Sequence, residues 1–453
     1  MLNAEDYGFR VGNNAESNGK ALQLAVSCGG DIYVTTPGVY DISQQIIVGS
    51  NTTLYFGAGV VLRRQNNDNK NGYAFINSGA FTRDYNENIK VIGLNLVCNG
   101  VESTGFGKTA QIVGLRAHLA FMYVKNLEIR NFECLDLLSK DYGIQVSSFE
   151  NVVIENVRIE GRKDGIHFGR GSKFVVRHGI FKTYDDPIAL NAFDYSVSNP
   201  NVGWIEDGII EDCYDLNDDA TVGFFCRILG GCWLDWYEGM EVMHSDTVVS
   251  NGRVYRVVMN PEDGKFYKSI TAPCHESGIA EYDGICWVMA QDGEIYDCGC
   301  RNLHFKDIYL QKKRSMSAFG VDFNRDTYAR SYYPGSKAAV QGNFVLENIH
   351  FQSDIPVMLR ANAPVDNIKI INSDMCGSVI YFQDIEAEGL EYTTTNVLVS
   401  GTTFRGKGMR LFTCDGKQSA DVKIVGSLAC DGFKGTYSGN VRVKYSDIEL
   451  TKE

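Results

Sequence analysis

The fold of this chain is decided by three short stretches of sequence: Gly143-Ile144-Gln145-Val146, Gly165-Ile166-His167-Phe168 and Pro187-Ile188-Ala189-Leu190. An isoleucine stands at the same place in each stretch, and successive isoleucines are 22 residues apart. A fixed period in the low twenties, with an apolar residue returning each time, is the signature of a solenoid whose coils stack on one another.

The same rhythm continues beyond these stretches. Six-residue frames with Asn or Asp at both ends recur, and each contains short apolar alternation bounded by turn residues, as β-strands do. The frames are Asn126–Asn131, Asn151–Asn156, Asn302–Asp307, Asn343–Asn348 and Asn367–Asn372. Strands this short cannot bury a face alone, whereas stacked coils bury them together. We therefore predict an all-β fold, a single-stranded right-handed parallel β-helix with a small inserted β module.

The recurring Asn has two explanations, and the sequence leaves both open. The side-chain amide can bond to the Asn of the next coil. Alternatively, Asn stands there because it tolerates the left-handed backbone conformation of a turn.

Composition agrees with a fold of many turns and argues against some partners. The chain has 453 residues, with 47 Gly and only 8 Pro. Its formal net charge of −13 argues against nucleic acid, whose phosphates require a basic face. No apolar run reaches the roughly 18 residues that suggest a membrane span. The 13 Cys are an odd number, so at least one is unpaired within the chain, and we expect buried core residues rather than a disulfide framework.

The first residues carry no targeting signal. Met1–Asp6 lacks the basic start and apolar core of a signal peptide, so the protein is either intracellular or has lost a leader. We expect a secreted, periplasmic or surface-exposed protein whose leader was removed, and leave an intracellular or phage-associated location open. Either a monomer or a trimer is compatible with the sequence.

Four parts are predicted along the chain. Residues 1–50 form the N-terminal cap of the β-helix and include a short helix at Ala21–Ser27, and residues 51–231 form coils that carry acidic residues. Residues 232–297 form the inserted β module, in which Val248–Val257 predicts a hairpin with Asn251-Gly252 as its turn. Residues 298–453 continue the coils to the end of the chain.

Three aspartates are the candidate catalytic residues. Asp164 and Asp186 are 22 residues apart, which places them in one column on adjacent coils about 4.8 Å apart at the backbone, and Asp185 is their neighbour. Like charges this close repel, so the cluster requires a reason. Glycoside hydrolysis supplies one, because a protonated carboxyl gives a proton to the leaving oxygen while a carboxylate activates water or attacks carbon. A plain turn role for Asp-Gly and Asp-Asp-Pro is the alternative.

The opening segments Asp6–Phe9, Gly29–Val34 and Pro37–Tyr40 resemble those of the pectin-lyase-like β-helix superfamily. Within it, Asp164-Gly165 and Asp185-Asp186, with 21 residues between the first Asp of each motif, look like the active-site motifs of polygalacturonases, glycoside hydrolase family 28. The resemblance covers roughly residues 1–230. It implies that Asp186 is the general acid, that Asp164 and Asp185 position and deprotonate water, and that the reaction inverts the anomeric centre. Inversion requires a gap of about 6.5–9.5 Å between the carboxyl groups.

The chain departs from that family where a galacturonate would be held. Val222 stands where the family has the His of Gly-His-Gly, and Asp322 stands where the family's Arg-Ile-Lys holds the uronate carboxylate. We therefore expect a divergent relative that acts on a neutral glycan, or on an acid sugar bound differently, rather than on ordinary galacturonan.

Four residues are candidates for substrate binding. His167 can replace the missing imidazole as a hydrogen-bond donor or be a structural His of its coil. Arg227 can hold the sugar or pair with a nearby carboxylate, and Asn191 can bind hydroxyl groups or belong to a loop. Asp322 is included because of its place in the family alignment.

Three classes of function remain. We predict a glycoside hydrolase that acts on a polysaccharide or oligosaccharide. The second class is a polysaccharide lyase, which needs a basic residue near the acidic residues, and none is expected beside the three Asp. The third is a non-catalytic glycan-binding β-helix of the tailspike or adhesin kind. No cofactor is expected; calcium would suit three carboxylates chemically but is not predicted.

Overall fold

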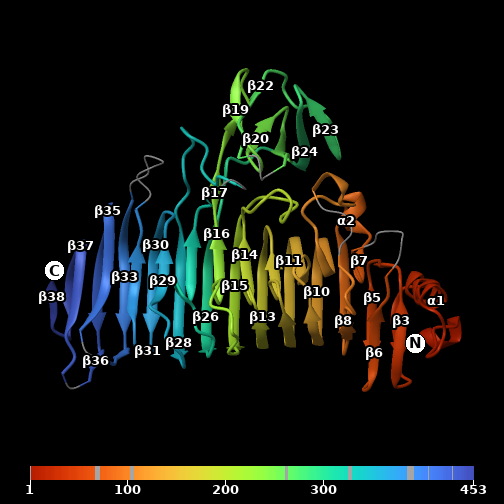
Figure 1. The fold of residues 1–453 in the computed structure, drawn as a ribbon, viewed down its shortest axis with the longest axis horizontal. Coiled ribbons are helices and arrows are strands. Elements are labelled where there is room, and N and C mark those ends of the chain that lie inside the picture. The colour runs from red at the N-terminus through yellow and green to blue at the C-terminus, as the bar shows by residue number, and fades with distance from the viewer. Residues whose placement is uncertain are drawn as a thin grey trace. The chain divides into compact units, whose positions relative to one another are not determined.

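The computed structural model describes residues 2–66, 72–102, 107–260, 264–324, 329–384, 392–406, 408–430 and 432–453. They divide into two compact units, Met1–Ala189 with Val197–Asn201 and Leu190–Ser196 with Val202–Glu453. In each unit the short strands of successive coils pair in parallel, and the predicted right-handed parallel β-helix is confirmed (Figure 1).

The first unit contains two short 3-10 helices, two α-helices and the first strands of the sheet. In chain order these are β1 (Leu2–Asn3), η1 (Ala4–Tyr7), α1 (Ala15–Ser27), β2 (Gly30–Val34), β3 (Gly38–Ile42), β4 (Ile46–Val48), β5 (Thr52–Phe56), β6 (Val60–Arg64), β7 (Phe75–Asn77), α2 (Gly79–Thr82), β8 (Asn86–Ile92), β9 (Asn95–Val97), η2 (Gly107–Thr109), β10 (Ala117–Leu137), β11 (Tyr142–Gly161), β12 (Ile166–Phe168), β13 (Gly171–Thr183) and the start of β14 (Ile188–Asn191).

The coils of the second unit are built from β15 (Ile205–Asp215), β16 (Cys226–Leu229), β26 (Cys300–Leu310), β27 (Phe319–Asp322), β28 (Gln341–Phe351), β29 (Val357–Ala361), β30 (Val365–Ile371), β31 (Asp374–Met375), β32 (Ser378–Phe382), β33 (Thr393–Ser400), β34 (Thr403–Phe404), β35 (Met409–Val425), β36 (Leu428–Ala429), β37 (Gly435–Ser446) and β38 (Leu450–Lys452).

Between β16 and β26 the described residues form three small separate sheets. Their strands are β17 (Gly231–Cys232), β18 (Leu234–Asp235), β19 (Met240–Val242), β20 (Thr247–Ser250), β21 (Arg253–Val257), β22 (Tyr267–Ser269), β23 (Ile279–Tyr282), β24 (Ile285–Asp292) and β25 (Asp297–Cys298). The predicted hairpin is confirmed, because β20 and β21 pair antiparallel and Asn251 and Gly252 form its turn with φ of 49° and 74°. We continue to interpret this segment as an inserted module.

The cap helix begins earlier than predicted. It was expected at Ala21–Ser27, whereas α1 starts at Ala15 because the Asn14 side chain caps it by accepting a hydrogen bond from Ser17 N at 2.8 Å. Strands β2, β3 and β4 already pair in parallel with β5, β6 and β7, so stacking begins before residue 51.

The 22-residue period sets the register of the coils that carry the aspartates. Ile144 of β11 pairs with Ile166 of β12, and Ile166 N donates to Pro187 O at 2.9 Å. Ile144, Ile166 and Ile188 are fully buried. Burying an isoleucine stabilises a fold by about 1.5–3 kcal/mol, so the residues that predict the solenoid also form part of its core.

Both explanations of the recurring Asn hold at once. In the first unit each side-chain amide donates to the residue of the preceding coil: Asn88 to Asn51 at 2.8 Å, Asn126 to Asn88 at 2.9 Å and Asn151 to Asn126 at 2.8 Å. The backbone φ of these four residues lies between 54° and 59°. We call this stack the amide ladder. The second unit repeats it, with Asn302 donating to Asp207 and Asn343 donating to Asn302, both at 2.9 Å.

The cysteines are all free. Nine of the thirteen are buried, as expected for small core residues, and no disulfide links any of them. No helix in the described part of the chain is both long and apolar enough to cross a membrane.

Replacing Asn126 with Ala should destabilise the protein by about 2–3 kcal/mol. The change removes two ladder hydrogen bonds, each worth roughly 0.5–1.5 kcal/mol, and leaves alanine in a left-handed conformation that costs about 1 kcal/mol. Denaturant unfolding followed by circular dichroism measures the loss. Asn126→Gly relieves the backbone strain but not the missing amide, so it should be the milder change; equal losses in the two variants would contradict the role of the left-handed φ.

Replacing Lys173 with Asn should stabilise the protein. Lys173 is in register with Asn151 and has a φ of 62°, so it interrupts the amide ladder at a left-handed position. The substitution adds a ladder hydrogen bond and relieves backbone strain. It removes the ion pair with Glu150, but the lysine of this pair is 62% exposed, and such surface ion pairs contribute little to stability. We expect a gain of about 1 kcal/mol in the free energy of unfolding. A Lys173→Gln variant, whose longer amide does not fit the ladder, should show no such gain.

Candidate functional site

Asp164, Asp185 and Asp186 converge in the first unit, and we call them the acidic cluster. One carboxylate oxygen from each residue lies within 4.8 Å of the other two. Asp164 and Asp186 are only 4% and 3% exposed, whereas the Asp185 side chain keeps 33% of its surface. The cluster is therefore mostly buried and opens to solvent at Asp185.

The stacking of two coils brings these residues together. Asp164 precedes β12 and Asp186 precedes β14, and Gly165 N donates to Asp186 O at 3.0 Å. Gly165 has to be glycine, because a Cβ there would lie 2.7 Å from the carbonyl oxygen of Pro187. The close approach of the two coils thus depends on a residue without a side chain.

The expectation that no basic residue lies beside the acidic cluster is wrong. Lys163 Nζ lies 3.2 Å from Asp164 Oδ1 and also forms an ion pair with Asp185. The signal was present in the sequence, because Lys163 and Asp185 are 22 residues apart, like Asp164 and Asp186. The lysine therefore neutralises carboxylates of two successive coils.

The charges of Lys163 and Asp164 stabilise each other. Burial favours the neutral carboxyl of Asp164, but the positive charge of Lys163 and the hydrogen bond with His167 outweigh it and hold the pKa of Asp164 below its usual value. Burial likewise favours the neutral amine of Lys163, but the carboxylates of Asp164 and Asp185 raise the pKa of that lysine. At neutral pH Asp164 is a carboxylate and Lys163 an ammonium group, so Asp164 is not a proton donor there.

An aromatic residue borders the cluster on the preceding coil. His167 Nδ1 lies 3.3 Å from Asp164 Oδ2, and the His167 ring stacks on Tyr142 with centroids 4.2 Å apart. The guanidinium of Arg116 lies over the Tyr142 ring, 5.0 Å from its centroid. His167 is fully buried. Its contacts with Asp164 and Tyr142 therefore orient the carboxylate from within the protein.

The spacing of the carboxylates bears on the chemistry. Inverting glycosidases hold their two carboxyl groups about 6.5–9.5 Å apart to admit a water, and retaining enzymes about 5–5.5 Å apart. The nearest oxygens of the acidic cluster, within 4.8 Å of one another, are closer than the inverting arrangement. Three oxygens at this distance are also within reach of a common cation, and Lys163 supplies a positive charge beside them.

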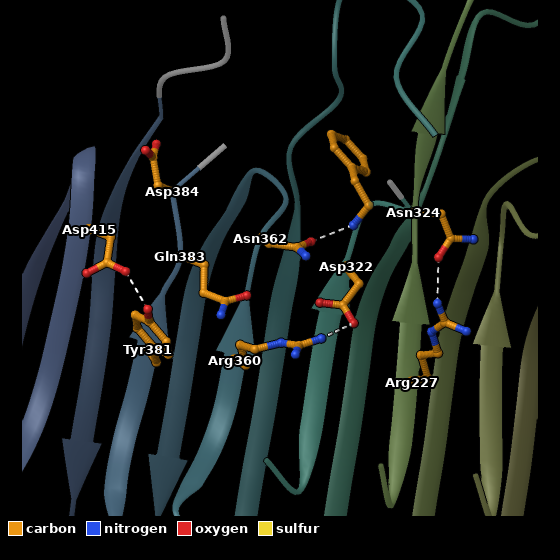
Figure 2. A pocket seen from close by; sticks show the side chains of 10 residues that line it. Arg227, Asp322, Asn324, Arg360, Asn362, Tyr381, Gln383, Asp384 and Asp415 are labelled. Carbon is orange, nitrogen blue, oxygen red and sulfur yellow. Dashed lines mark hydrogen bonds and ion pairs between the residues drawn. The ribbon is translucent and has the colours of Figure 1, made fainter. Parts of the chain in front are cut away.

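Two other predicted residues line a cavity of the second unit (Figure 2). Arg227 on β16 and Asp322 on β27 border this cavity of about 430 Å³. Asp322 accepts a hydrogen bond from Arg360 at 2.6 Å, and Arg227 donates to the side chain of Asn324. Arg360 thus holds Asp322 in place, and Asn324 holds Arg227. Neither Arg360 nor Asn324 was among the predicted site residues.

Asn191 belongs to the second unit as well. Its side chain donates to Asp194 Oδ2 at 3.0 Å, and the two residues are only 2% and 3% exposed. This contact fixes the loop after β14. The predicted residues are thus distributed over both units: the acidic cluster and His167 in the first, and Asn191, Arg227 and Asp322 in the second.

A scan of protein-family models found no match to this sequence, and a search of curated proteins found none either. Solved structures do match. The A-module of mannuronan C-5 epimerase AlgE4 from Azotobacter vinelandii is 11% identical over 100% of both chains, with a TM-score of 0.53. The N-terminal fragment of gene product 12 of bacteriophage Phi29 is 14% identical over 99% of this chain and 65% of that one, with a TM-score of 0.54.

A family 28 exopolygalacturonase from Yersinia enterocolitica also matches, at 13% identity over 99% of this chain and 79% of that one, with a TM-score of 0.47. That score is too low to support an argument about this chain. Since all three identities are below 15%, the likenesses concern architecture alone. The chain has the right-handed parallel β-helix fold that the epimerase module and the phage fragment share.

Proposed function

We propose that the protein is a glycoside hydrolase that cleaves a polysaccharide and that the acidic cluster is its catalytic centre. The observation that carries this proposal is the convergence of Asp164, Asp185 and Asp186 from two adjacent coils around Lys163. Three carboxylates held together, two of them buried, are unfavourable unless a function or a counter-charge requires them. The likeness to a mannuronan C-5 epimerase module adds support, since that protein is named for a polysaccharide substrate.

The residues divide into proton donor and water-activating groups. General acid catalysis requires a carboxyl that carries a proton, whereas Lys163 lowers the pKa of Asp164 and is also paired with Asp185. We therefore assign proton donation to Asp186 and the activation of water to Asp164 and Asp185. Lys163 and His167 are positioning residues, which hold the Asp164 carboxylate in place.

The proposed stereochemical outcome requires a wider spacing of the carboxyl groups than the one observed. We propose inversion, which the motif resemblance implies, and it requires a water between the acid and the base. Since the nearest oxygens lie within 4.8 Å, the acid must move away from the base when sugar and water enter. Proton NMR of the first product formed reports its anomeric configuration directly. A retained configuration would contradict inversion and would indicate that a carboxylate of the cluster attacks the sugar carbon itself.

A lyase is the second candidate, and Lys163 is the observation that favours it. Lyases remove the proton next to a uronate carboxylate, and a protonated lysine can neutralise that carboxylate while the acidic cluster holds a cation. A lyase makes an unsaturated product that absorbs in the near ultraviolet and loses activity with a chelator. A hydrolase does neither, and a non-catalytic binding protein yields no product at all.

Replacing Asp186 with Asn should abolish cleavage while the protein stays folded. Removal of a general acid lowers the rate by about 10²–10⁴-fold. Release of reducing ends is measured on a panel of neutral and acidic polysaccharides, with circular dichroism as the check on folding. Asp31→Asn, a matched change of an exposed aspartate on β2, should leave the rate unchanged. Full activity in the Asp186→Asn variant would overturn the proposed centre.

Replacing Lys163 with Met should destabilise the protein most at neutral pH. The buried Asp164 then lacks its counter-charge, and we expect a loss of about 3 kcal/mol, at the low end of the range for buried pairs because the Lys163 side chain is 22% exposed. The pKa of Asp164 is lowered in the folded protein, so the stabilisation from this pair is present above the ordinary value of 3.8 and is lost as the pH falls below it.

The difference between Lys163→Met and the unaltered protein should therefore shrink as the pH falls from neutrality to below 3.8. Thermal unfolding across this range measures it. Lys182→Met, which removes an exposed lysine of β13, should change stability by less than about 0.5 kcal/mol at every pH. A loss for Lys163→Met that does not vary with pH would show that Asp164 is not the group that needs the lysine.

A further inference from the structure

The cavity of the second unit is bordered by a column of polar side chains, one from each successive coil. Val321 pairs with Ala361, Ala361 with Phe382, and Phe382 with Cys414, and these four residues are buried in the core. The residue after each of them therefore points outward, because successive side chains of a strand alternate between faces. We call these outward residues the polar column: Asp322, Asn362, Gln383 and Asp415.

The polar column presents hydrogen-bonding groups at a regular spacing. Neighbouring coils are about 4.8 Å apart, and the backbone bonds of Asn362 N to Val321 O at 2.9 Å and Gln383 N to Ala361 O at 2.8 Å keep that register. Carboxylates stand at the two ends and amides between them (Figure 2). A ligand whose polar groups repeat along its length can meet such a column at several points.

The positive charges of the cavity are already engaged by protein groups. Arg360 binds the Asp322 carboxylate at 2.6 Å and lies over the ring of Phe224, 4.9 Å from its centroid. Arg227 donates to Asn324 Oδ1. The lining holds two guanidinium groups against three carboxylates, since Asp384 adds to the two of the polar column. An anionic ligand would therefore meet a net negative surface.

Buried atoms in the lining lack a hydrogen-bond partner, among them Asp322 Oδ1, Asn324 Nδ2 and Arg360 Nε. Asp322 Oδ1 is an acceptor and Asn324 Nδ2 is a donor, and their residues are 3% and 4% exposed. Buried polar groups are almost always hydrogen-bonded in folded proteins, so each of these atoms calls for a partner from outside the chain. Sugar hydroxyl groups both donate and accept, and they can satisfy the acceptor and the donors alike. A ligand carboxylate can satisfy only the donors, Asn324 Nδ2 and Arg360 Nε, and the Asp322 carboxylate would repel it.

We infer that this cavity binds an uncharged, hydroxyl-rich sugar chain, which lies along the polar column and is recognised there independently of the acidic cluster. Asp322 accepts from one hydroxyl group, Asn324 donates to another, and Gln383 contacts the neighbouring sugar unit. Arg227 and Arg360 position Asn324 and Asp322 rather than binding an acidic sugar.

The test uses the full chain with Asp186→Asn, so that the probes are not consumed. Binding of cellohexaose, xylohexaose, mannohexaose and hexagalacturonate is measured by calorimetry and saturation-transfer NMR. We expect at least one neutral hexamer to bind more tightly than hexagalacturonate. Its affinity should change little from about 0.05 to 0.5 M salt, because screening acts on charged partners.

Adding Gln383→Ala should weaken binding of that neutral hexamer about fivefold, the loss of roughly one ordinary hydrogen bond. Gln352→Ala, a matched change of an exposed glutamine in the same unit, should not weaken it. The inference is overturned if no neutral hexamer binds, if hexagalacturonate binds best, or if Gln383→Ala and Gln352→Ala behave alike. If Asp186 proves not to be catalytic, these results stand unchanged, because none of them depends on cleavage.

Discussion

The stacking of coils depends on residues that turn the chain at a left-handed φ and bind the same residue one coil away. Asn88, Asn126 and Asn151 meet both demands, with φ between 54° and 59° and amides that donate to the preceding coil. Asn tolerates this conformation better than most residues with a side chain, and its amide has both an N–H group that donates and an oxygen that accepts. The turn that bends the chain thus also holds the register between coils.

The register between successive coils decides which residues, distant in the sequence, lie in contact. In the coils that carry the aspartates, residues 22 apart become neighbours, and the result is a crowded column in which Asp164 and Asp186 share space with Asp185. Lys163 makes this tolerable, because it pairs with carboxylates of both coils. In the second unit the same rule builds a different surface, the polar column, where Asn362 and Gln383 separate the carboxylates. One stacking rule therefore produces a charged cluster in one unit and a hydrogen-bonding surface in the other.

Sequence reasoning succeeded where the period was regular. It predicted the β-helix, the hairpin at Asn251-Gly252 and the stacking of the 143–190 coils. It missed the start of α1, because the cap at Asn14 lies seven residues before Ala21, where the hydrophobic pattern begins. It did not place Lys163 beside the acidic cluster, although the 22-residue period puts this lysine opposite Asp185.

By itself, the sequence determined which residues share a column in the coils between residues 143 and 189, because a period of 22 residues holds there and makes this a matter of counting. The tertiary structure alone decided the partners in the second unit. Arg227 pairs in register with Gly320 although 93 residues separate them, and the strands β17–β25 lie between the two in the chain. No period survives such an interruption. The pairing of Asp322 with Arg360 and the surface beside it follow from three-dimensional packing.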